Sequence, residues 1–200
     1  MTSSKIDSPA PRNVARLVLV RHASTAWSRS GKHTGRTDIP LDQDGQRAAR
    51  SLAPTIASLG AVKAYSSPLR RALDTCSLSG LGDGVVVDPD LVEWDYGEYE
   101  GMTSAQISAR RPGWDLFVDG CPGGERASDV SERVARFFSM LSEAEDPSVV
   151  VFAHGHLLRV LGARWLGLPP EAGRSFLLGA PSVSTLVWEH GNPAVERWNG

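Results

Sequence analysis

The chain has 200 residues, of which 41% are hydrophobic and 22% are charged, close to the average of globular domains. This composition excludes a disordered chain, a collagen-like repeat and a disulfide-rich miniprotein. The net charge of −2 lacks the basic surplus that is typical of nucleic-acid binders. Apolar runs stay well short of the ~20 residues that a membrane span requires, which argues against a membrane protein.

Residues 1–13 are largely polar and indicate a disordered tail, which leaves residues 14–200 as a single domain. The tail lacks the apolar core of a secretory signal, so we expect a cytoplasmic protein. In that compartment Cys76 and Cys121 are expected as free thiols, although a bridge between them stays open.

Short apolar runs predict the strands of a sheet. The candidates are 17–20, 62–65, 85–87 and 149–152, with a final strand over 183–188 that pairs with the stretch around 195–198. Runs that are apolar throughout, such as 149–152, indicate strands that are covered on both faces.

Helical periodicity and helix-end residues predict helices between these strands. Asp42 caps the first, whose apolar positions run to Leu59, and Pro54 predicts a kink or an early end inside it. Further helices are expected over 70–77, from Thr103 to 110, from Ser128 through Leu141, and over 156–166. Strands that alternate with helices predict an α/β three-layer sandwich, with a largely parallel sheet flanked by helices.

Polar side chains follow these strands at the points where the strands end. They are Arg21 and His22 after the first run, Arg70 on the first helical turn after the second, Glu93 a few residues after the third, and His154, Gly155 and His156 after the fourth. Because ligands in open α/β sheets bind beyond the carboxyl ends of the strands, we expect these residues to share one site.

This combination of arginines, histidines and a carboxylate suits a phosphate ester. A guanidinium matches phosphate oxygens with two parallel hydrogen bonds and keeps its charge at any working pH. Helix N-termini near Arg70 and His156 add N–H donors, and Gly155 allows the backbone to approach a ligand closely. A histidine with one unprotonated ring nitrogen can attack phosphorus, and the carboxyl group of Glu93 can protonate the leaving oxygen.

With these residues in this order, the sequence resembles the histidine phosphatase superfamily, which includes the cofactor-dependent phosphoglycerate mutases. The likeness covers residues 17–188 and implies a phosphoglycerate mutase-like fold. It rests on 19–25 (LVRHAST), Thr34-Gly35 with 38–41 (DIPL), 66–72 (SSPLRRA), 93–97 (EWDYG) with Glu100-Gly101, and 153–155 (AHG).

The resemblance implies that His22 is the nucleophile, which becomes a phosphohistidine, and that Glu93 is the proton donor. Arg21, Arg70 and His154 are implied to complete the phosphate pocket. The substrate-binding candidates are Ser28, Thr34, Gly35, Tyr96, Gly155 and His156. No metal ion or organic cofactor is implied.

Within the family, motifs such as Trp27-Ser28 resemble the branch of sedoheptulose-bisphosphatase-like enzymes and bacterial acid phosphatases. The mutases are longer than this chain, which favours hydrolysis of the ester over phosphate exchange. We therefore expect a phosphatase acting on a small-molecule phosphate ester, a sugar phosphate or bisphosphate, with no nucleic-acid or membrane partner and with a homodimer left open. The alternatives are a phosphoglycerate mutase, a phosphatase acting on a protein, and a catalytically silent phosphate-sensing or protein-binding module.

Simpler roles stay open for several of these residues. His154 and His156 have the short spacing found in some metal sites, although neither a carboxylate nor a cysteine lies close to them in the sequence. His156 also fits a solvent-facing position at a helix start, and Glu93 fits a surface ion pair. His33 is expected to be a surface residue.

Overall fold

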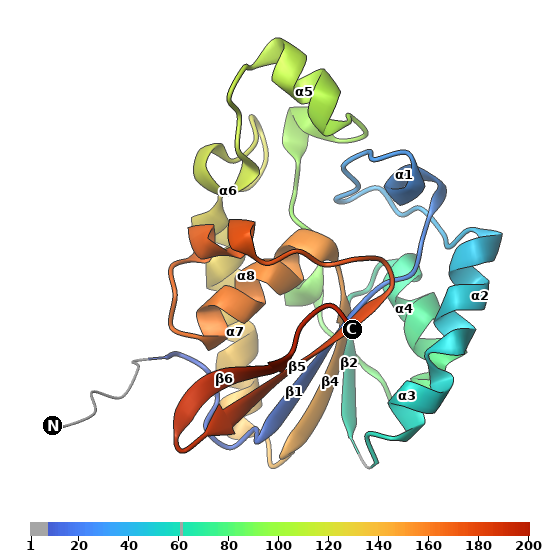
Figure 1. Cartoon of the computed structure of the whole chain (residues 1–200), viewed down its shortest axis with the longest axis vertical. Coiled ribbons are helices and arrows are strands. Elements are labelled where there is room, and N and C mark those ends of the chain that lie inside the picture. Colours follow the sequence, from blue (N-terminus) through green and yellow to red (C-terminus); the bar gives the residue numbers. More distant parts are fainter. Residues whose placement is uncertain (1–7, 61) are drawn as a thin grey trace, which may run out of the picture.

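The computed structural model describes residues 8–60 and 62–200, which form a six-stranded sheet between two layers of helices (Figure 1). The strands are β1 (Arg16–Arg21), β2 (Lys63–Ser66), β3 (Val86–Val87), β4 (Ser148–Ala153), β5 (Ser182–Glu189) and β6 (Asn192–Arg197). Their order is β3-β2-β4-β1-β5-β6, in which the first four are parallel and β5 and β6 run antiparallel. The predicted α/β sandwich with a largely parallel sheet is confirmed.

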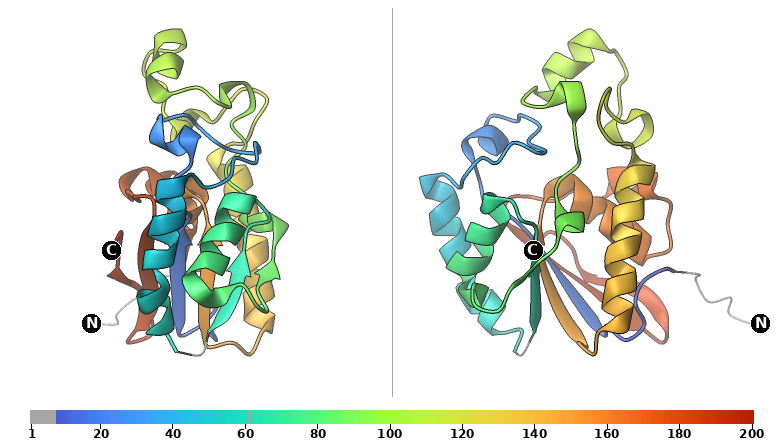
Figure 2. Two further views of the ribbon diagram at one scale, coloured as in Figure 1. Left: turned by 90° about the vertical axis from the view of Figure 1, so that its right-hand side faces the viewer. Right: turned by 180° about the vertical axis from the view of Figure 1, so that it is seen from behind.

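The α-helices are α1 (Ala26–Arg29), α2 (Gln43–Ser51), α3 (Ala53–Ala57), α4 (Arg70–Cys76), α5 (Ser104–Arg110), α6 (Leu116–Asp119), α7 (Ala127–Glu143) and α8 (Gly155–Trp165). Short helical turns are η1 (Ser77–Leu81), η2 (Pro89–Leu91), η3 (Gly97–Tyr99) and η4 (Pro170–Ser175). The short helices α1, α5 and α6 lie beyond the sheet, above the carboxyl ends of its parallel strands (Figures 1 and 2).

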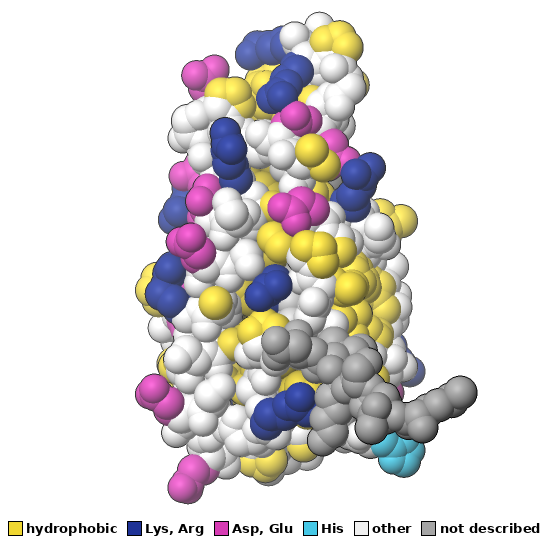
Figure 3. Space-filling view, turned by 90° about the vertical axis from the view of Figure 1, so that its left-hand side faces the viewer, with side chains coloured by type: hydrophobic (Ala, Val, Ile, Leu, Met, Phe, Trp, Pro, Cys, Tyr) yellow, Lys and Arg dark blue, Asp and Glu magenta, His cyan; other side chains and the backbone are white. Residues whose placement is uncertain are grey.

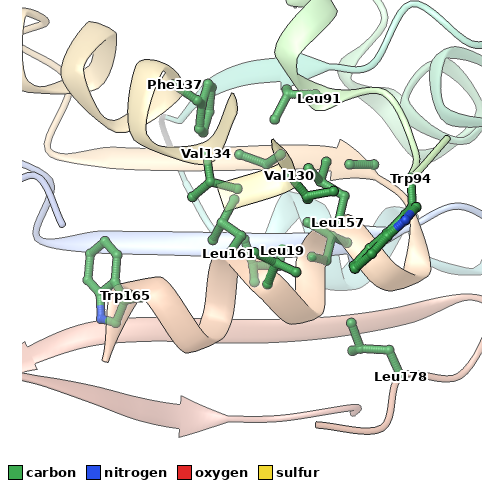
Figure 4. Packing of buried hydrophobic residues seen from close by; sticks show 14 of the residues in the cluster. Leu19, Leu91, Trp94, Val130, Val134, Phe137, Leu157, Leu161, Trp165 and Leu178 are labelled. Atoms are coloured by element: carbon green, nitrogen blue, oxygen red, sulfur yellow. The ribbon is translucent and has the colours of Figure 1, made fainter. Parts of the chain in front are cut away.

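Alternate residues of the central strands pack on opposite faces of the sheet, as strand geometry requires. Leu17 and Leu19 of β1 belong to the cluster that contains α7 and α8, whereas Val18 and Val20 pack in the cluster that contains Ile56 of α3. Figure 4 shows Leu19 among side chains of α7 and α8, among them Val130, Val134, Leu157 and Leu161. Burial on both faces explains why these strands are apolar at every position.

The helix-end predictions hold in the first layer of helices. The Asp42 carboxylate accepts a hydrogen bond from the backbone N–H of Gly45 at 2.7 Å and caps α2. The predicted break also occurs: α2 ends at Ser51, and α3 begins at Ala53 with Pro54 in its first turn. Proline fits there because the first N–H groups of a helix need no partner within it.

Two predictions need correction. The run 85–87, expected as a buried strand, forms the two-residue edge strand β3, in which Val86 and Val87 are 37% and 48% exposed because β2 is its one neighbour. Residues 8–13, expected within the disordered tail, pack onto the domain. Ala10 is buried, and the Asn13 side chain donates to the carbonyl of Leu141 at 2.8 Å. The rest of the predicted tail, residues 1–7, lies outside the described residues.

The surface charge and the hydropathy of the helices match the expectations from the composition. On the face shown in Figure 3, basic and acidic side chains are interspersed. None of the helices in the described ranges is both long and apolar enough to cross a membrane. Cys76 and Cys121 are both free and buried, and burial raises the pKa of each thiol to about 12.

Candidate active site

The carboxyl ends of β2, β4 and β1 lie side by side and bring distant parts of the sequence together. The backbone ladder continues one residue past these ends: His22 N–H donates to the carbonyl of Ala153, and Ser67 N–H donates to that of Phe152, both at 3.0 Å. His22, Ser67 and His154 therefore start at the same level of the sheet, as the rule for open α/β sheets predicts.

A cavity of about 230 Å³ opens at this edge of the sheet. Its lining residues are Arg21, His22, Ser28, Gly31, Lys32, His33, Thr34, Glu93, Tyr96, Ser104, Gly155, His156, Arg159 and Leu178. All the site residues predicted from the sequence line this cavity except Arg70, Gly35 and His154.

His22 is held as a neutral imidazole with one free nitrogen. Its Nδ1 lies 2.7 Å from the carbonyl oxygen of Ala23, and because a carbonyl can only accept, Nδ1 carries the proton. Burial, followed by the charges of Arg71 and Arg21, lowers the pKa of His22 well below its ordinary value. Nε2 is therefore left unprotonated, as a nucleophile requires.

His154 stands next to His22, with the two ring centroids 5.1 Å apart. The Nε–H of Arg71 donates to Nδ1 of His154 at 3.1 Å, so the imidazole proton is on Nε2, which lies 2.8 Å from Oγ of Ser67. Burial and Arg71 lower the pKa of His154 well below its ordinary value. Two neutral histidines thus share the inner end of the site with a buried cation.

The arginine that accompanies Arg21 in the site is Arg71. The prediction that Arg70 completes the phosphate pocket is therefore corrected. Arg70 is exposed and lies outside the cavity lining, and its backbone N–H donates to Asp38 at 2.9 Å. Arg71, the next residue of α4, is fully buried. Neighbouring residues of a helix point about 100° apart, so only one of the pair can face the strand ends. Residue order alone does not decide which one does so.

The guanidinium of Arg71 is held by a cage of acceptors. Its Nη1 donates to the carbonyl of Thr37 at 3.0 Å, and its Nη2 donates to the carbonyls of Thr34 and Gly35 at 3.0 and 2.9 Å. With the bond to His154, Arg71 connects the loop after α1 to the end of β4. This cage fixes a positive charge beside both histidines.

Gly35, predicted to bind substrate, instead lies buried behind the cavity wall. Its N–H donates to the Glu100 carboxylate, which also accepts the N–H of Thr37 at 3.1 Å. A Cβ atom on Gly35 would lie 2.5 Å from the carbonyl oxygen of Trp94, so no other residue fits there. We therefore interpret Gly35 as a packing requirement of the Arg71 cage.

Glu93 is buried at the N-terminus of α8. Its Oε1 accepts the N–H groups of Trp94 and Leu157, both at 2.9 Å, and its Oε2 accepts that of His156 at 3.1 Å. Negative charge is favourable at this end of a helix. The carboxylate faces the cavity and is bonded to backbone amides, so the surface ion pair considered for Glu93 does not describe it.

Arg21 lines the same cavity. Its Nη1 donates to the carbonyl of Leu178, but its Nε is buried without a hydrogen-bond partner among the described residues. Leaving a buried donor unpaired costs about 1–3 kcal/mol. A Cβ atom on Gly155 would lie 3.2 Å from this guanidinium, which explains the glycine after His154.

The outer part of the cavity contains residues that the sequence analysis did not assign to the site. His33, expected at the surface, lines it together with Lys32 and Arg159. Arg159 follows His156 by three residues on α8, and this i, i+3 spacing places both on one side of a helix. That spacing was a sequence signal by which Arg159 could be assigned to the cavity. Lys32 lies in a loop, where no periodicity predicts its position.

The predicted Ser28 lines the cavity, but its hydroxyl is engaged in capping α1. Its Oγ accepts the N–H of Thr25 at 2.9 Å and donates to the Thr25 carbonyl at 3.1 Å. A substrate contact through this hydroxyl would compete with the cap. We therefore interpret Ser28 first as the residue that shapes this loop.

The structure bears on the alternative that His154 and His156 bind a metal ion. Within residues 8–60 and 62–200, no group of three His, Cys, Asp or Glu side chains could hold a metal ion. Nδ1 of His154 accepts from Arg71, and Nδ1 of His156 lies 2.5 Å from the Tyr96 hydroxyl. Each of these nitrogens therefore already has a protein partner.

Comparison with known proteins adds independent information. A model of the histidine phosphatase superfamily (branch 1) matches residues 17–200. An acid phosphatase from Mycobacterium tuberculosis is 37% identical over 179 residues, which is 88% of either chain. Sedoheptulose 1,7-bisphosphatase from Saccharomyces cerevisiae is 35% identical over 190 residues, covering 79% of this chain and 70% of that protein.

Solved structures show the same likeness. The product of an open reading frame from Mycobacterium tuberculosis matches with a TM-score of 0.88 and 36% identity, over 94% of this chain and 98% of that one. A mycobacterial glucosyl-3-phosphoglycerate phosphatase matches with a TM-score of 0.83 and 30% identity, over 94% and 100%. The similarity therefore spans the sheet, the helices and the segments that form the cavity.

Proposed function

We propose that this chain, which belongs to the histidine phosphatase superfamily and is a phosphatase, hydrolyses a small phosphate monoester through a phosphohistidine on His22. The observation that carries the proposal is the buried, neutral imidazole of His22, with its Nδ1 proton held by the Ala23 carbonyl and two arginines beside the ring. This arrangement keeps the Nε2 lone pair available at neutral pH. The adjoining positive charges stabilise the phosphoryl oxygens during transfer.

In the first step Nε2 of His22 attacks phosphorus and the bond to the ester oxygen breaks. The leaving oxygen takes the broken bond's electron pair and a proton from Glu93, which enters this step as the protonated acid. Oε1 of Glu93 already accepts two amide N–H groups and Oε2 accepts one, so Oε2 has the lone pair that can carry this proton. The alcohol then departs, leaving phosphohistidine and the Glu93 carboxylate.

In the second step the Glu93 carboxylate takes a proton from water as the water oxygen attacks phosphorus. The bond from phosphorus to Nε2 breaks, which restores the neutral His22 and releases inorganic phosphate. Arg21, which lines the cavity, would hold the phosphoryl oxygens in both steps, and Arg71 and His154 would support the charge from behind His22.

We propose a sugar phosphate or bisphosphate as the substrate. Lys32 and Arg159 line the outer part of the cavity, while Glu93 is the one carboxylate among the lining residues. This excess of positive charge favours a substrate with a second anionic group. Two of the relatives, sedoheptulose 1,7-bisphosphatase and glucosyl-3-phosphoglycerate phosphatase, are named for sugar-containing phosphate esters.

Phosphate release by the purified protein tests the proposal. The assay covers sugar mono- and bisphosphates, phosphoglycerates and p-nitrophenyl phosphate. His22→Ala should lower kcat by more than about a thousandfold on each ester that the wild type hydrolyses. His190→Ala is the matched control, because the side chain of His190 is 89% exposed. Turnover retained in His22→Ala would remove the mechanism, and phosphate exchange between phosphoglycerates without net release would favour a mutase.

A covalent trap examines the intermediate directly. Protein quenched during turnover of a labelled ester should carry an alkali-stable, acid-labile phosphate, as phosphohistidine does. The label should be lost in His22→Ala and kept in His190→Ala. A label that persists in His22→Ala would place the intermediate on another residue.

A further inference from the structure

Two histidine rings from distant segments line the outer part of the cavity. His33 lies in the loop after α1 and His156 lies on the first turn of α8. The ring centroids are 6.0 Å apart and the ring planes are within 8° of parallel. Both rings are therefore placed to contact one ligand group. Which ring nitrogens carry protons determines whether that group must donate or accept hydrogen bonds.

The proton on His33 is placed by a backbone carbonyl. Nδ1 of His33 lies 2.9 Å from the carbonyl oxygen of Met102. Since the carbonyl can only accept, Nδ1 is the donor, and in the neutral ring Nε2 is the acceptor. The backbone N–H of His33 also donates to this carbonyl, at 2.8 Å, so the ring is held close to its partner.

The proton on His156 is placed by Tyr96. Nδ1 of His156 lies 2.5 Å from the Tyr96 hydroxyl, which has no other hydrogen-bond partner in the part of the chain that the structure describes. Tyr96 is 2% exposed and Nδ1 of His156 is the one partner of its hydroxyl among the described residues, so we assign the O–H as the donor and this nitrogen as the acceptor. Burial raises the pKa of Tyr96, while burial and Arg159 lower the pKa of His156, so both groups are neutral. The imidazole proton of His156 is therefore on Nε2.

Both Nε2 atoms are left accessible to a ligand. Neither has a hydrogen-bond partner among the described residues. Within these residues Arg21 Nε is the one buried side-chain polar atom without a partner, so the two Nε2 atoms are not buried. The cavity thus contains an acceptor on His33 and a donor on His156. Two hydrogen bonds of about 2.8 Å that meet at a tetrahedral hydroxyl oxygen bridge nitrogens about 4.6 Å apart. One hydroxyl therefore reaches both rings when their Nε2 atoms lie closer together than the ring centroids, which are 6.0 Å apart.

We propose that His33 and His156 together bind a hydroxyl group of a polyhydroxylated phosphate ester, and that Tyr96 is the positioning residue that keeps the proton of His156 on Nε2. A hydroxyl group donates one hydrogen bond and accepts others, so it satisfies both nitrogens at once. A carbonyl or a second phosphate oxygen would satisfy His156 alone. The inference rests on the proposed function, because the ligand occupies the same cavity.

Nitrogen-15 NMR of the imidazoles tests the placement of the protons without any substrate. In the wild type we expect Nε2 of His156 and Nδ1 of His33 to carry the protons. Tyr96→Phe should abolish the single tautomer of His156 while leaving that of His33 unchanged, which also shows that the variant is folded. A wild-type His156 with its proton on Nδ1 would overturn the proposal.

Hydrolysis of a matched pair of esters tests the recognition. Sorbitol 6-phosphate and n-hexyl phosphate have carbon chains of equal length and differ in their hydroxyl groups. Tyr96→Phe should lower the ratio of kcat/KM for the polyol to that for the alkyl ester by about threefold to tenfold, the usual worth of one hydrogen bond. His156→Asn should lower the ratio similarly, whereas His156→Gln should restore much of it because its amide reaches the position of Nε2.

The outcomes separate this inference from the function on which it rests. A ratio that stays unchanged in Tyr96→Phe and His156→Asn would overturn hydroxyl recognition while the phosphatase stands. No phosphate release by the wild type from either ester or from p-nitrophenyl phosphate would overturn both. A lowered ratio in His156→Gln equal to that in His156→Asn would show that the Nε2 donor is not what matters.

Discussion

The inner end of the cavity is anchored on strand ends, whereas its outer part is carried by loops and one helix. At the inner end, His22 is 4% exposed, His154 and Arg71 are fully buried, and each has a defined hydrogen-bond partner. In the outer part, Lys32 and Ser104 are exposed. The rigid inner end suits a chemical step that is common to many esters. The more exposed outer part suits the selection of one ester over another. Inner substitutions should therefore reduce every activity, and outer ones should change preference.

The largest effect that depends on the leaving group is expected from Glu93→Gln, because Glu93 supplies the proton to that group. Glutamine retains an oxygen that can accept the amides of Trp94 and Leu157 but cannot deliver a proton to the leaving group. Hydrolysis of an alkyl phosphate should fall by about 10²–10⁴-fold, and hydrolysis of p-nitrophenyl phosphate far less, because nitrophenolate leaves without protonation. Steady-state kcat on both esters measures this, and equal losses would deny Glu93 the acid role.

Arg71→Lys and Arg70→Lys form the next test, since the two residues are adjacent and differ in burial. Lysine cannot replace a guanidinium that bonds Thr34, Gly35, Thr37 and His154. We expect Arg71→Lys to lower kcat/KM about a hundredfold on all esters. Arg70→Lys, at an exposed position, should change it by less than about twofold. A larger loss in Arg70→Lys than in Arg71→Lys would reverse the assignment.

The buried histidines predict that acid destabilises the protein. The pKa values of His22, His154 and His156 are all lowered, chiefly by burial. As pH falls below about 6.5, the unfolded chain takes up protons that the folded chain does not, so the free energy of unfolding decreases. Each histidine contributes up to about 1.4 kcal/mol per pH unit until the pH reaches its folded pKa.

Urea unfolding between pH 7.5 and pH 5 checks this dependence. His156→Gln removes one of the three groups and should make the decline shallower. Stability that does not decline between these pH values would contradict the neutral state assigned to the inner histidines.

The smallest effects are expected from the cations of the outer part. Arg159→Gln should lower the preference for a sugar bisphosphate over the matching monophosphate by about threefold to tenfold, because Arg159 is half-buried. Lys32→Gln should have a smaller effect, since exposed charges are screened by solvent. Arg47→Gln, exposed on α2, is the control. Equal losses on bisphosphate and monophosphate would indicate that these residues do not contact a second anionic group.

Much of the inner end was predictable because a parallel sheet aligns the ends of its strands. Four apolar runs and the residues that follow them predict that His22, Glu93 and His154 lie near one edge of the sheet. Local rules performed equally well at Asp42 and Pro54, where the cap and the helix break depend on residues within a few positions.

The errors occurred where a choice depended on packing. Arg70 and Arg71 both fit the motif, and burial against His154 selected Arg71. Gly35 stood in a motif associated with substrate, yet the carbonyl of Trp94 explains why it must be glycine. His33 carried no signal because its contacts are with Met102 and with the cavity, on segments far away in the sequence.

The sequence by itself determined the fold class, the order of the strands and helices along the chain, and the set of chemical groups after each strand. These properties follow from periodicity and capping, which act over short stretches of chain, and from the alignment of strand ends that any parallel sheet imposes. Only the tertiary structure decided which arginine is buried, where the protons of His22, His154 and His156 reside, and which loops complete the cavity. Those features depend on hydrogen bonds and burial between residues that are distant in sequence, which residue order does not encode in any local pattern.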